Sequence, residues 1–137
     1  MRIRALAVLT LTALAGCGGG RGGEAEKVRD VMERLTEAIA RGDGEAACRD
    51  LTPEARRLVV TSAEAAAGGE FASCGAVLGA VAYDLPEDAR RRLHEAEYSV
   101  ELHGDDTAIA DSQAVSGEAR LRKQGGRWIV TRLTFGS

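Results

Sequence analysis

The sequence has few aromatic residues: two phenylalanines, two tyrosines and one tryptophan among 137 residues. Proteins that bind single-stranded nucleic acid stack bases on aromatic side chains, and nucleic-acid-binding domains in general concentrate basic residues on one face. The formal net charge here is −3, and no basic run is interleaved with aromatic residues. The composition therefore argues against a nucleic-acid partner.

The sequence also lacks the short motifs that mark common active sites, including the nucleophile elbow, the metalloprotease helix, the phosphate loop and the dinucleotide fingerprint. Histidine occurs twice and cysteine three times. Two of the cysteines, Cys48 and Cys74, are separated by 26 positions, and with two scattered histidines they match no zinc-site spacing. We expect neither a metal ion nor a cofactor.

No hydrophobic run is long enough to cross a membrane. The apolar residues 5–14 follow Arg2 and Arg4, and ten helical residues span only about 15 Å, the size of a signal-peptide core. The next four residues, Leu14-Ala15-Gly16-Cys17, resemble the lipobox of bacterial lipoproteins at every position. The resemblance implies cleavage before Cys17 and lipidation of its thiol. An ordinary signal peptide with an incidental cysteine is the alternative.

This N-terminal pattern predicts three segments: a signal peptide over residues 1–16, a lipidated cysteine with a flexible glycine-rich tether over residues 17–23, and one domain over residues 24–137. The mature chain would keep 16 basic and 21 acidic residues, a net charge of −5. Acyl chains on Cys17 would insert into membrane lipid without any spanning helix. The expected location is the extracytoplasmic face of the cell membrane.

Cys48 and Cys74 form an even pair in a chain predicted to be exported, where disulfides form and persist. Both fall on apolar faces of predicted helices. We expect a disulfide between them; two buried free thiols are the alternative.

The first part of the domain has helical periodicity. One apolar stripe runs through residues 24–40 and ends before Gly42. Asp43 is positioned to cap a short second helix, and Thr52 followed by proline predicts the start of another. Gly68-Gly69 interrupts this pattern before a third apolar stripe, which extends from Phe71 to Val81.

After Pro86 there is room for one helical turn, and then the periodicity changes to two, as in a half-buried strand. Strands are expected over residues 94–103, 107–112, 115–122 and 127–135, with turns at residues 104–106 and 125–126. The fold class is therefore α+β, with N-terminal helices packed on one face of a curved antiparallel sheet.

Four segments of the domain resemble the nuclear-transport-factor-2-like superfamily, also called cystatin-like or ketosteroid-isomerase-like. They are ARGD at residues 40–43, ACRDLTPEA at 47–55, GDDTAIA at 104–110 and GGRWIV at 125–130. The resemblance implies a cone-like architecture over Glu24 to Phe135. Members of this superfamily include isomerases, dehydratases and proteins without a known activity, so fold alone does not give the function.

His94 and Tyr98 are weak candidates for catalysis. Both share the strand parity of Val100 and Leu102, so both are expected to face the interior, where an imidazole near a phenol can transfer protons. The alternative is a solvated His94 at the start of the strand and an ordinary core tyrosine at position 98.

The last predicted strand carries apolar residues on both faces. In a regular strand, Trp128 and Val130 would point to one face. Ile129, Leu133 and Phe135 would point to the other. Helices can cover only one face, so Trp128 and Val130 are candidates for a protein-partner or homodimer interface on the open face of the sheet. Alternatively, a terminal tail covers them.

Together, these features predict a lipid-anchored binding module of the bacterial cell envelope, without a catalytic role. A small-molecule isomerase or hydratase that uses the cone cavity is one alternative, and a structural envelope subunit is another.

Overall fold

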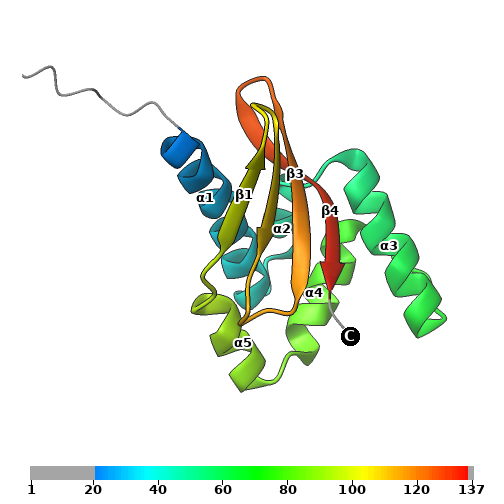
Figure 1. The fold of residues 1–137 in the computed structure, drawn as a ribbon. Coiled ribbons are helices and arrows are strands. Elements are labelled where there is room, and N and C mark those ends of the chain that lie inside the picture. The colour runs from blue at the N-terminus through cyan, green and yellow to red at the C-terminus, as the bar shows by residue number, and fades with distance from the viewer. Residues whose placement is uncertain (1–20, 136–137) are drawn as a thin grey trace, which may run out of the picture.

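The computed structural model describes residues 21–135 as five helices followed by a four-stranded antiparallel sheet (Figure 1). The helices are α1 (Arg21–Ala40), α2 (Gly44–Arg49), α3 (Pro53–Ala67), α4 (Cys74–Asp84) and α5 (Glu87–His94). The strands are β1 (Ser99–His103), β2 (Thr107–Asp111), β3 (Gly117–Gln124) and β4 (Arg127–Phe135), paired in sequence order. The predicted α+β class is confirmed.

Local signals set most of the helix ends. Asp43 accepts a hydrogen bond from the backbone of Ala46 at the start of α2, and Thr52 accepts one from Ala55 at the start of α3. Gly68 ends α3 in the left-handed conformation (φ 68°), which costs glycine little because it has no Cβ. These predicted caps and stops are confirmed.

Helix α1 begins at Arg21, so it includes residues 21–23, the last three that the sequence assigns to a tether. Glycine weakens a helix by up to about 1 kcal/mol per residue relative to alanine. The first turn is nevertheless held in place, because Glu24 accepts a hydrogen bond from the Trp128 indole at 2.8 Å. Glu24 also pairs with Lys123 at 3.0 Å.

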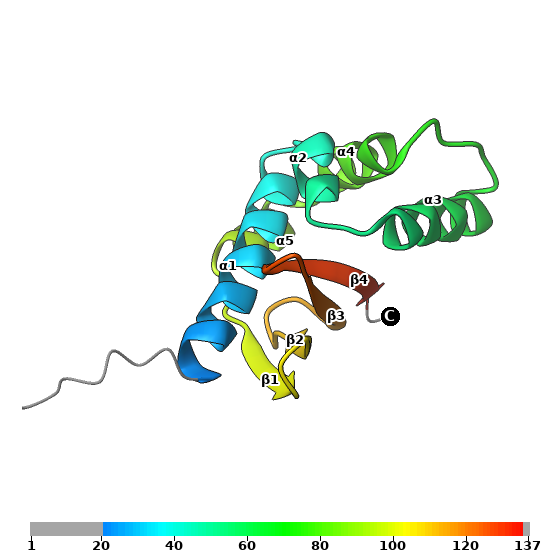
Figure 2. The same cartoon turned by 90° about the horizontal axis from the view of Figure 1, so that it is seen from above.

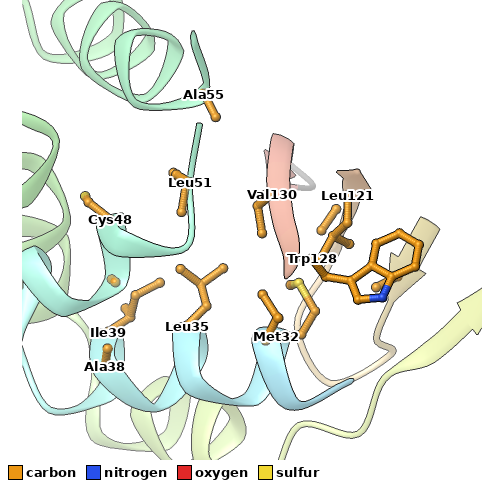
Figure 3. Packing of buried hydrophobic residues seen from close by; sticks show 14 of the residues in the cluster. Met32, Leu35, Ala38, Ile39, Cys48, Leu51, Ala55, Leu121, Trp128 and Val130 are labelled. Atoms are coloured by element: carbon orange, nitrogen blue, oxygen red, sulfur yellow. The ribbon is translucent and has the colours of Figure 1, made fainter. Parts of the chain in front are cut away.

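The core lies between α1 and the sheet (Figures 2 and 3). Met32, Leu35 and Ile39 extend from α1 toward Leu51 and the last strand, and each is at most 5 % exposed. Leu51 continues this layer by forming a short parallel bridge to Val130, which links the segment before α3 to the free edge of β4. The first predicted apolar stripe is therefore the main helical face of the core.

The expectation that Trp128 and Val130 lie on the open face of the sheet is wrong. Trp128 is 4 % exposed and Val130 is fully buried. The reason is a β-bulge: Leu121 pairs with Val130, whereas Arg120 pairs with Arg132, so two residues of β3 lie opposite three of β4. The extra residue reverses the alternation. Apolar residues of opposite parity in β4 therefore face the same side.

Charged residues are frequent on the open face instead. Glu101, Arg120 and Arg122 are exposed there, with Ile109 and Ile129 half-buried among them. Because Trp128 and Val130 are buried in the core, they do not support a partner or homodimer interface on this face.

Helices α2 and α4 pack so closely that Gly44→Ala is expected to lower the free energy of unfolding by about 1–3 kcal/mol, the usual cost of overpacking. An added Cβ would lie 2.0 Å from the backbone oxygen of Gly75 and 2.7 Å from the nitrogen of Gly79. Gly79→Ala is the matched control, because its Cβ would meet nothing within 4 Å. Urea unfolding compares the two variants, and equal stabilities would contradict the close contact.

Candidate functional site

The described residues form an apolar groove of about 860 Å³. It lies between α3, α4, α5 and the end of the sheet where β4 finishes. We call this feature the α3–α4 groove. Its apolar wall includes Leu58, Val59, Val77, Leu78, Val81 and Leu133. Its volume falls within the range of small-molecule sites, which is about 300–1,000 Å³.

The groove exists because α3 packs incompletely on the rest of the domain. Ala55, near its start, is the buried residue of this helix, whereas Leu58 is 52 % exposed. Val81 on α4 is 46 % exposed and lines the same groove. Large apolar side chains that face a shared concave surface are typical of a binding site.

A few polar groups line the groove as well. Arg92 comes from α5 and Arg132 from β4, together with the hydroxyl-bearing residues Ser62, Ser116 and Thr134. Among the described lining residues the two arginines are the charged ones, and no carboxylate is present. Arg132 is the cross-strand partner of Arg120, so its side chain belongs to the open face of the sheet. Arg92 pairs with Asp88 at 2.7 Å, so the lining is mainly apolar.

The prediction that His94 lies on a strand is wrong. His94 is the last residue of α5. This helix has two full turns, and β1 begins only at Ser99, so the strand parity assigned to His94 does not apply. Its Nδ1 atom lies 2.8 Å from Oε2 of Glu37, and its side chain is 41 % exposed.

Tyr98 is buried, in agreement with the prediction, and is 8 % exposed. Burial raises the pKa of its phenol above the usual value, against a smaller opposite effect of a hydrogen bond with Thr36. Neither Tyr98 nor the exposed His94 is among the residues that line the groove. The structure therefore does not bring them together as an interior acid–base pair.

The sequence interpretation missed a polar cluster that joins α1 to the sheet. Glu24 accepts from Nε1 of Trp128 and from Nζ of Lys123, and its second oxygen pairs with Nζ of Lys27 at 3.0 Å. Hydrogen bonds from Lys123, Lys27 and Trp128 lower the pKa of Glu24 to about 2. The cluster lies at the start of α1, and its chemistry is structural.

Cys48 and Cys74 form a disulfide, as predicted, with their Cα atoms 6.2 Å apart. The bond joins α2 to the first residue of α4. It closes the loop that contains α3, so it restrains both helices that form the apolar wall of the groove.

The lipobox and Cys17 lie outside the residues that the structure describes. Between residues 21 and 135, no helix combines the length and apolarity needed to cross a bilayer. In the same part of the chain, no three histidine, cysteine or acidic residues are grouped closely enough to hold a metal ion.

No family model, curated protein or solved structure matches this chain. Its functional assignment therefore depends on the sequence patterns and on the geometry of the α3–α4 groove.

Proposed function

We propose that this chain is a lipid-anchored binding module of the bacterial cell envelope, held at the extracytoplasmic face by Cys17, and that it binds an apolar ligand in the α3–α4 groove. One observation carries the binding role: an open groove of about 860 Å³ with large apolar side chains at its surface. We also propose a nuclear-transport-factor-2-like fold. The element order supports this assignment, as does a groove between the helices and the sheet.

The charged groups in the groove favour binding over the isomerase or hydratase alternative. Proton transfer needs a group that gains and loses a proton near the working pH. Arginine side chains are not such groups, and the described lining contains no histidine, carboxylate, cysteine, lysine or tyrosine. A ligand-binding groove also distinguishes the proposal from a purely structural subunit.

Val81→Glu tests the groove. We expect the affinity for the neutral apolar dye N-phenyl-1-naphthylamine to fall about tenfold or more, because a carboxylate would replace apolar surface and resist desolvation. The measurement is a fluorescence titration of the purified full chain. Tyr83→Glu is the matched control, since Tyr83 is on the same helix, is 88 % exposed and does not line the groove. Equal affinities in the two variants would contradict a binding site in this groove.

Cys17→Ser tests the anchor. We expect the variant to lose labelling by a radioactive fatty acid and either to leave the membrane fraction or to remain unprocessed, because lipidation requires the thiol. Cys48→Ser is the matched control, since Cys48 lies in the folded domain. Undiminished lipid labelling of the Cys17 variant would exclude the proposed anchor.

A further inference from the structure

We infer that the α3–α4 groove takes an extended segment of a partner protein, which adds a short strand to the free edge of β4 and places alternate apolar side chains in the groove. This inference rests on the proposed binding function and deepens it by naming the class of ligand. Three observations carry it: unpaired backbone groups on β4, their position on the groove, and a pairing that the same edge already makes.

The edge of β4 that faces away from β3 carries unpaired backbone groups at Leu133. Backbone groups of successive residues in an antiparallel sheet point alternately to the two neighbouring strands. Lys123 donates its backbone N–H to Asp106 at 2.7 Å, on the β2 side of β3, and β2 pairs with β3 without a bulge. Ala119, four residues before Lys123, therefore also points toward β2. Because Ala119 is the cross-strand partner of Leu133, the N–H and C=O of Leu133 point away from β3.

This edge of β4 faces the groove. Arg132, Leu133 and Thr134 are consecutive, and all three line it. The side chains of Arg132 and Thr134 belong to the open face of the sheet, opposite Arg120 and Glu118. Since side chains alternate between the two faces of a strand, three consecutive residues line one groove where the edge of the strand faces it. Helix α3 runs beside β4 and supplies the opposite wall (Figure 2).

The same edge already pairs with an extended segment just before Leu133. Val130 accepts a hydrogen bond from the backbone N–H of Thr52 at 2.9 Å and donates one to the carbonyl of Asp50 at 2.7 Å, in a short parallel bridge. Pro53 then begins α3, so the chain leaves the edge before it reaches Leu133. In the described part of the chain, no backbone hydrogen bond outside the helices and the sheet involves Leu133. An added strand would continue the pairing where α3 interrupts it.

The backbone groups of Leu133 favour a peptide over a hydrocarbon chain. A lipid that lay against β4 would cover the N–H and C=O without giving them a partner, which costs free energy. An extended peptide would bond both groups, as in other cases of strand addition to a sheet edge. Its side chains at alternate positions would contact the exposed apolar residues Leu58 and Val81 across the groove.

The first experiment is a calorimetric titration of the purified full chain with three capped peptides. The parent peptide alternates valine with threonine between terminal lysines, and its two analogues are N-methylated at the valines or at the threonines. Only one alternate set of N–H groups faces a given neighbouring strand. We therefore expect one analogue to bind about tenfold more weakly than the parent, because it loses backbone hydrogen bonds. The other analogue should bind within about threefold of the parent.

Amide hydrogen exchange locates the contact on β4. We expect exchange at the N–H of Leu133 to slow about tenfold or more in the complex with the parent peptide, because this N–H gains an acceptor. Ile129 is the matched control, since it lies on the same strand and is already paired within the sheet. Its exchange should change less than about twofold.

The outcomes separate this inference from the proposed function. If N-phenyl-1-naphthylamine binds but the parent peptide does not, strand addition is overturned and the apolar site stands. The same conclusion follows if methylation affects both analogues equally, or if exchange at Leu133 is unchanged in the complex. If neither dye nor peptide binds, both proposals are overturned. A chain that sediments as a dimer, with Leu133 protected before any peptide is added, would indicate that a second copy occupies this edge, which also overturns the inference.

Discussion

Replacing Trp128 by glutamate is expected to unfold the domain or to lower its melting temperature by roughly 20 °C or more, the shift produced by a loss of about 5 kcal/mol in a domain of this size. Trp128 is 4 % exposed. Truncating a buried tryptophan costs about 3–5 kcal/mol, and a buried carboxylate without a partner adds to that cost. The new carboxylate would also face Glu24, which now accepts the indole hydrogen bond.

Ile129→Glu is the control for this prediction, because Ile129 is the next residue of β4, points to the opposite face of the sheet and pairs with Arg122. We expect a shift of only a few degrees, because half-buried Ile129 lies on the open face, where the new carboxylate keeps contact with water and stands opposite Arg122. Trp128→Phe should fall between the two, because it keeps the apolar ring and loses the donor to Glu24. Similar melting temperatures for the two glutamate variants would contradict the placement of Trp128 in the core.

Much of the fold was predictable because its signals are local. Asp43 and Thr52 cap helices through hydrogen bonds to residues three positions away. The apolar stripe of α1 needs only a helical period to be recognised. The predicted export and the apolar positions of Cys48 and Cys74 together predict a disulfide, and the structure shows that bond.

The predictions that are wrong concern features that the periodicity of apolar residues does not show. The bulge in β4 reverses the alternation after Val130, and this shift is visible only in the pairing with β3. The period-two pattern also placed His94 in a strand, although α5 continues through it. Likewise, the groove depends on how far α3 stands from β4, which is set by tertiary packing and not by any residue type in the sequence.

The disulfide between Cys48 and Cys74 is expected to contribute about 3.5 kcal/mol of stability, since a bond of this kind restricts the unfolded chain and the closed loop has a sequence separation of 26 residues. Cys48→Ala combined with Cys74→Ala should therefore lower the melting temperature by roughly 10–15 °C. Reductant should produce a similar shift in the unaltered chain and no further shift in the double variant.

The same bond should also matter for the groove, because the loop that it closes contains α3. This helix has little buried surface of its own, with Leu58 more than half exposed, and weakly packed elements open most readily. In the double variant we expect faster hydrogen exchange in α3 than in α1, together with weaker binding of N-phenyl-1-naphthylamine at a temperature where the domain remains folded. Unchanged exchange in α3 after loss of the bond would mean that packing against β4 alone holds this wall of the groove.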